Sequence, residues 1–85
     1  MNGHLDALGQ GLAEAGMSVA TRYWERPALL RVVSPALPGV GESVSVAEGP
    51  DGQPWFRCSS GTLFAPCRDV PGATAEVRAR LLRLL

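Results

Sequence analysis

The residues best suited to metal or nucleophilic chemistry are two cysteines, Cys58 and Cys67, and the single histidine, His4. A protein zinc site takes about four ligands, and the few cysteine and histidine residues here do not supply them. A serine–histidine–acid triad would depend on His4, and nothing in the spacing supports one. We therefore predict no metal, no cofactor and no catalytic residues, and we expect the protein not to be an enzyme.

The cysteines are predicted to remain free thiols. If Ser60 and Gly61 form a two-residue hairpin, Cys58 lies opposite Leu63, and Cys67 follows about four residues further along the chain. At roughly 3.3 Å per residue the separation is ~13 Å, whereas a disulfide needs Cα atoms within ~7 Å. Cys58 is expected to be a small core residue. Cys67 stands beside an arginine before the final helix, where its thiol pKa would fall, so a reactive Cys67 stays open as the alternative.

Charge and hydropathy exclude several function classes. Eight arginines balance eight acidic residues, with no lysine, so the net charge is zero. A neutral chain has no long-range attraction to nucleic acid or to an anionic membrane. No apolar run approaches the ~18 residues that span a bilayer, and the first residues lack a signal peptide pattern. We expect a cytoplasmic protein, with Glu42, Glu48 and Asp51 as solvated loop residues.

The chain is predicted to be one α+β domain over residues 1–85, with a helix at each end. Leu5, Leu8 and Leu12 fall on one face of a helix over 4–16. Asp69 caps a final helix that runs to about Leu84. Five strands are expected between the helices, at 17–24, 29–33, 43–47, 55–59 and 62–65. Their short connections favour an antiparallel meander of four to five strands, with both helices on one sheet face.

Two turns predict which side chains share a sheet face. A three-residue loop at 50–52 pairs Gly49 with Gln53, and a two-residue loop at 60–61 pairs Ser59 with Thr62. Counting outward from both turns places one set of residues toward the helices. That predicted core set is Val44, Val46, Phe56, Cys58, Leu63 and Ala65.

The opposite sheet face is predicted to carry Trp55, Arg57 and Phe64. With both helices elsewhere, the two aromatic rings would be exposed, as aromatic residues at interfaces often are. Either these residues form an interface, or Arg57 and the loop over 34–41 cover them within the monomer. Leu82 and Leu85 at the end of the final helix are a further candidate contact.

The stretch from Trp55 to Asp69 resembles a signature of small, uncharacterised actinobacterial proteins: a tryptophan-rich strand, a Ser-x-Gly turn, an apolar strand ending in proline, and an aspartate before an alanine-rich helix. This chain departs from the signature at Arg57, Ser59 and Ser60, where those proteins often carry more tryptophan. Residues 30–35 and Pro38 resemble the strand and loop of those proteins, so the likeness spans about 28–83. It implies the same layout and no activity. The order of elements is also similar to small secretion-chaperone-like folds, which implies dimers that bind other proteins.

These observations predict a non-catalytic protein-interaction or regulatory accessory module that is homodimeric. Its candidate interface residues are Trp55, Arg57, Phe64, Leu82 and Leu85. The alternative is a small-molecule-binding protein or minor enzyme, with a pocket near loop 34–41, Arg57 and Cys67.

Overall fold

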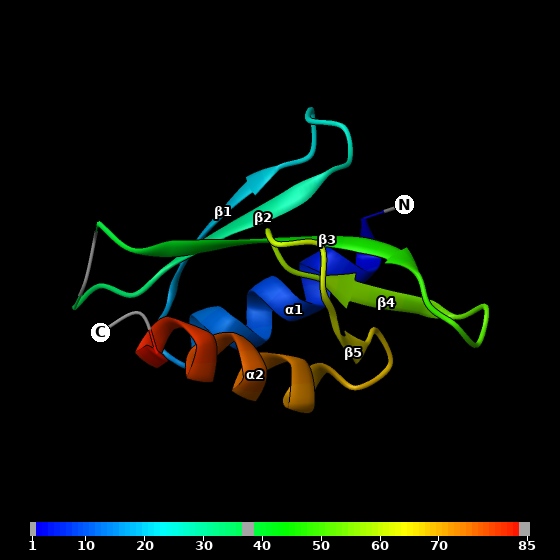
Figure 1. Ribbon diagram of the computed structural model, residues 1–85. Helices are drawn as coiled ribbons and strands as arrows, with labels where there is room; N and C mark the ends of the chain where they lie inside the picture. Colours follow the sequence, from blue (N-terminus) through cyan, green and yellow to red (C-terminus); the bar gives the residue numbers. More distant parts are fainter. Residues whose placement is uncertain (1, 37–38, 84–85) are drawn as a thin grey trace.

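The computed structural model describes residues 2–36 and 39–83 and shows a five-stranded sheet between two helices (Figure 1). The elements in chain order are α1 (Gly3–Glu14), β1 (Ser18–Arg22), β2 (Leu29–Val33), β3 (Gly41–Glu48), β4 (Pro54–Arg57), β5 (Leu63–Pro66) and α2 (Val70–Arg83). The strands are antiparallel and follow one another across the sheet from β1 to β5. The predicted α+β meander is confirmed.

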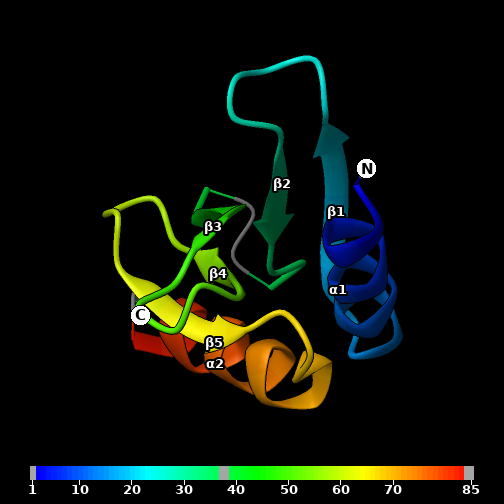
Figure 2. The ribbon, with the colours of Figure 1, turned by 90° about the vertical axis from the view of Figure 1, so that its right-hand side faces the viewer.

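Both helices pack on the same face of the sheet, as the sequence predicts (Figure 1). Figure 2 shows α1 beside β1 and α2 beside β5, with the sheet twisting between them. The opposite face, which we call the outer face, has neither α1 nor α2 over it. Among the described residues, no helix is long and apolar enough to cross a membrane.

The core lies between the helices and the sheet, and the helical spacing of apolar residues explains it. Leu5, Leu8 and Leu12 of α1 are buried, as are Ala73, Val77 and Leu81 of α2. They meet Leu30, Val32, Val44, Phe56 and Ala65 from the sheet. Asp69 caps α2 through a hydrogen bond from the Gly72 amide to Oδ1 at 3.0 Å, so the predicted cap is confirmed. The predicted helix position of Leu84 lies outside the described residues.

The predicted turn between β3 and β4 is also confirmed. The Gly49 amide donates to the Gln53 carbonyl at 2.8 Å, which closes a three-residue loop. Gly52 has a φ of 76°, a conformation that glycine adopts without steric cost. The resulting register places Val46 opposite Phe56.

The predicted turn between β4 and β5 is wrong by one residue. The Cys58 amide bonds the Thr62 carbonyl at 3.0 Å, so the loop contains three residues and Ser59 does not pair with Thr62. A β-bulge follows, because Phe56 pairs with Ala65 while Arg57 pairs with Leu63. The bulge moves Leu63 to the outer face and Phe64 to the core side, the reverse of the expectation.

Candidate interaction surface

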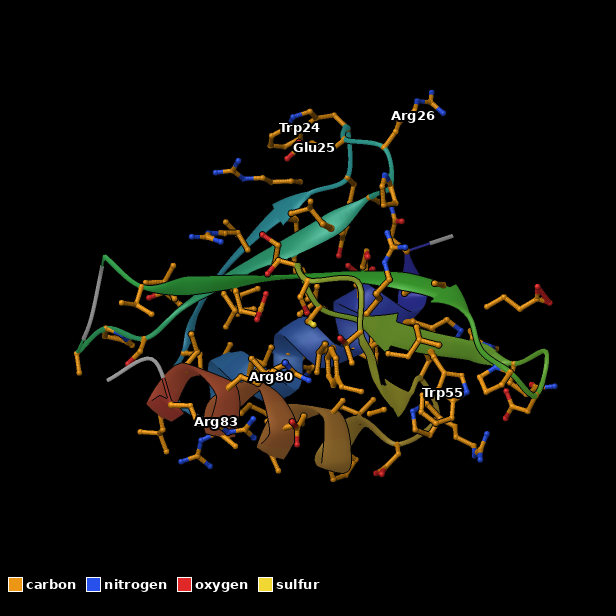
Figure 3. The ribbon with its side chains drawn as sticks, in the orientation of Figure 1. Trp24, Glu25, Arg26, Trp55, Arg80 and Arg83 are labelled. Atoms are coloured by element: carbon orange, nitrogen blue, oxygen red, sulfur yellow. The ribbon has the colours of Figure 1, made fainter. Side chains whose placement is uncertain are left out.

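The β1–β2 hairpin ends in a projecting loop, residues 23–28, that we call the hairpin tip. Figure 3 shows Trp24 and Arg26 at this tip, far from both helices. Trp24 is 76% exposed, although tryptophan is a large apolar residue that gains from burial. The tip is therefore a candidate contact site. Sequence reasoning assigned Trp24 to a strand, and the available signal for a tip was the break at Glu25, Arg26 and Pro27.

A groove of about 420 Å³ lies next to the hairpin tip and extends over the outer face. Its lining consists of Pro27, Leu29 and residues 43–45 and 57–61. Pro27 also lines a pocket formed by residues 23–28, so the tip adjoins the groove at this residue. Strand β2, strand β3 and the β4–β5 loop supply the walls of the groove.

The outer face carries positive charge on a chain whose net charge is zero. By the alternation of strands, Arg22, Arg31 and Arg57 project from this face, and the described strands place no acidic residue on it. Arg22 pairs with Glu25 at 3.7 Å. Within the described chain, neither Arg31 nor Arg57 has an acidic partner. Arg31 instead donates to the Ser43 hydroxyl at 3.3 Å.

Arg57 and Ser45 stand directly opposite each other on β4 and β3, inside the groove. Ser45 is only 8% exposed. Across residues 2–36 and 39–83, neither side chain has a side-chain hydrogen bond to the protein. A guanidinium and a hydroxyl side by side, both without protein partners, are donors suited to an anionic oxygen.

Glu42 holds the β4–β5 loop that forms one wall of the groove. Its Oε1 accepts hydrogen bonds from the Ser59 amide at 3.0 Å, the Ser59 hydroxyl at 2.5 Å and the Ser43 amide at 2.9 Å. The residue is 8% exposed. The expectation of a solvated loop residue is therefore wrong for Glu42. The residue is buried in strand β3, and its carboxylate accepts hydrogen bonds from three protein donors instead of from water.

Trp55 lies on the outer face but is partly buried against its own hairpin. Its ring covers Gly49 so closely that the backbone there leaves no room for a Cβ. Its indole Nε1 donates to Asp51 Oδ1 at 3.0 Å. Asp51 also accepts from the Gln53 amide at 3.1 Å, so this carboxylate organises the turn rather than only being solvated.

Phe64 is not on the outer face with Trp55 and Arg57. Its ring stacks on Phe56 with centroids 6.2 Å apart, and the Arg80 guanidinium lies 5.5 Å from its centroid. Arg80 belongs to α2, so Phe64 contributes to the packing of α2 on the sheet. The bulge separates the three predicted aromatic and cationic residues into different environments.

The remaining candidate contact residues are Leu82 and Leu85. Leu82 is 65% exposed on α2, away from the groove. Leu85 lies outside the described residues.

Both cysteines are free, as the sequence predicts, and both are buried, which the sequence predicts for Cys58 alone. Burial raises the pKa of the Cys67 thiol to about 11, which argues against an activated Cys67. Cys67 does not line the groove, and its backbone amide bonds the Pro54 carbonyl at 3.0 Å. Cys58 does line the groove. Burial raises its pKa, but hydrogen bonding with Ser60 and Thr62 and the charge of Arg80 more than offset this, so the net pKa is lowered.

Within the described ranges, no cluster of three histidine, cysteine or acidic side chains is placed to hold a metal ion. No family model, curated protein or solved structure matches the chain. The resemblance to small actinobacterial proteins stays a prediction.

Proposed function

We propose that the protein is a non-catalytic interaction module that binds a protein partner through the hairpin tip and the adjoining groove. The observation that carries this proposal is Trp24, which is 76% exposed on a hairpin tip whose Pro27 lines the groove of the outer face. Exposed tryptophans are among the residues that contribute most binding energy at protein interfaces. Arg57 of the originally expected interface belongs to this surface, whereas Phe64 supports the fold.

The partner at this surface differs from a second copy of the chain. A twofold-symmetric contact places the same patch of both subunits face to face. Arg31 and Arg57 would then meet like charges on a face whose strand positions carry no acid to neutralise them. Homodimerisation, which is part of the proposal, uses α2 instead, where Leu82 is 65% exposed. We place the module in the cytoplasm, where its two free thiols stay reduced.

Site-specific photo-crosslinking in cells that naturally express the protein tests the tip. A benzophenone amino acid replaces Trp24 in one variant and Arg78 in a control variant. Arg78 is also exposed, but it lies on α2. We expect a discrete adduct of higher mass from position 24 and none of that mass from position 78. Identical adducts from both positions, or none from position 24, would refute the proposed surface.

Light scattering over a concentration series tests self-association, with Leu82→Arg as the matched variant. We expect a dimer that this substitution converts to a monomer. A monomer at every concentration would refute the homodimer and leave the partner-binding surface unaffected.

A second candidate function, small-molecule binding, is favoured by the size of the groove. Ligand pockets typically measure about 300–1,000 Å³, and the groove of about 420 Å³ falls in this range. Of the residues that the sequence predicts for a small-molecule pocket, Arg57 lines the groove and Cys67 does not. A screen with small organic acids, followed through the backbone amide shifts of residues 43–45 and 57–61, distinguishes the two functions, because these residues line the groove.

A further inference from the structure

We propose that the groove binds the carboxylate of an acidic side chain in the partner, and that an apolar residue accompanies it. This inference rests on the proposed function, because it names the chemistry of the partner segment at the same surface. Arg57 provides the charge, Ser45 provides a second donor, and Pro27 and Leu29 contact the apolar neighbour.

The charge of the groove matches a single negative charge. Arg57 is the cation that lines the groove, and it has no acidic partner among the described residues. Arg31 does not line the groove and is engaged with Ser43. A carboxylate carries one charge, whereas a phosphorylated side chain carries about two and would need a second cation. A carboxylate is therefore the better match.

Ser45 offers a second donor beside Arg57. Its hydroxyl makes no side-chain hydrogen bond within the described chain. The buried side-chain atoms without a partner in the described chain are Thr74 Oγ1 and Arg80 Nε, so the Ser45 hydroxyl is still in contact with solvent and can donate to a ligand in the groove. The cross-strand pairing of Ser45 with Arg57 places both donors within reach of the two oxygens of one carboxylate.

The surroundings favour a protein segment over a free organic acid. Pro27 lines both the groove and the pocket of the hairpin tip, so the surface available to a ligand continues beyond the volume that one small acid fills. A free acid would leave Trp24 exposed. An extended segment with an acidic residue beside an apolar one would cover the tip and the groove together.

The test uses a capped pentapeptide with glutamate between two leucines, and a second peptide with glutamine in place of glutamate. Binding is followed through backbone amide shifts of the full chain in a ¹H–¹⁵N spectrum. We expect the glutamate peptide to shift the amides of residues 43–45 and 57–61 and to bind at least about tenfold more tightly than the glutamine peptide.

Three variants assign the contacts. Arg57→Gln should weaken binding of the glutamate peptide about tenfold, and Ser45→Ala should weaken it by a smaller factor. Arg31→Gln, which removes an outer-face arginine that does not line the groove, should leave the affinity unchanged. Dispersed amide spectra show that each variant is folded.

Several results would overturn the inference. Equal affinity for both peptides would exclude a carboxylate site, and equal losses from Arg57→Gln and Arg31→Gln would indicate nonspecific charge attraction. Pentanoate binding as tightly as the glutamate peptide would assign the groove to a free acid instead of a protein. The cellular crosslink at position 24 is independent of these results, so a crosslink without peptide binding would refute only the carboxylate chemistry.

Discussion

Glu42→Ala should destabilise the fold and loosen the groove in one step. The carboxylate accepts three hydrogen bonds, two of them from Ser59 in the loop that walls the groove. Hydrogen bonds to charged groups contribute about 1.5–3 kcal/mol each when buried. Because Ser59 is exposed, water can replace the two hydrogen bonds that it donates to Glu42, which lowers the cost of losing them. Alanine also removes the desolvation cost of burying the carboxylate charge.

These terms give an expected loss of about 2 kcal/mol in the free energy of unfolding. For a domain of this size each kcal/mol corresponds to about 4–8 °C in Tm, so Tm should fall by about 8–16 °C. Thermal unfolding followed by circular dichroism measures the change. Glu48→Ala is the matched control, because Glu48 ends the same strand, is exposed, and has no hydrogen bond or ion pair among the described side chains.

The same variant should affect the groove. With Glu42 absent, the amide signals of Ser59 and its neighbours should shift, and the glutamate peptide should bind more weakly than it does to the Glu48→Ala protein. If Glu42→Ala lowers Tm no more than Glu48→Ala does, the three hydrogen bonds do not hold the loop, and this reasoning is wrong.

Three further predictions concern single sites. Tyr23 has a pKa raised to about 12 by burial and by the 2.5 Å hydrogen bond to Asp6. The stability that this phenol contributes is therefore complete below pH 10 and is lost as pH rises toward 12. Ultraviolet titration of this single tyrosine should give a midpoint near 12 that moves toward 10 in Asp6→Asn. Gly9→Ala should stabilise α1 by up to about 1 kcal/mol, since its new Cβ makes ordinary contacts at 3.4 Å or more. Gly11→Ala should stabilise it less, because its Cβ would lie 2.9 Å from Thr74 Oγ1 of α2. Urea unfolding measures the free energy of both variants, and an equal gain in stability would contradict the packing described. Cys67 should react with iodoacetamide at pH 8 at least roughly a hundredfold more slowly than a peptide thiol, because its pKa of about 11 leaves little thiolate. Tandem mass spectrometry measures the alkylation of Cys67. Alkylation at the rate of a peptide thiol would refute its burial.

Local patterns predicted the elements and one of the two central turns. The leucines of α1, the Asp69 cap and the loop at 50–52 each depend on residues close together in the chain. Their hydrogen bonds and spacing are therefore visible in the sequence, and the strand order follows from short connections. Arg57 of the predicted interface does lie on the outer face, because the alternation of side chains along a strand is also visible in the sequence.

The second turn could not be predicted from its own residues. Glu42 takes the Ser59 amide and hydroxyl, which removes Ser59 from the ladder and lengthens the loop to three residues. The bulge that follows exchanges the faces of Leu63 and Phe64. A contact between residues distant in the chain thus decided the register, and with it the composition of the outer face.

The sequence by itself determined the helices, the five strands, the antiparallel order and the neutral net charge, because these follow from local periodicity and composition. Only the tertiary structure decided that Trp24 is exposed, that Cys67 is buried, and that Ser45 and Arg57 share a groove with a loop held by Glu42. Burial and the pairing of polar groups depend on which distant segments meet. That information arises when the sheet and helices pack together.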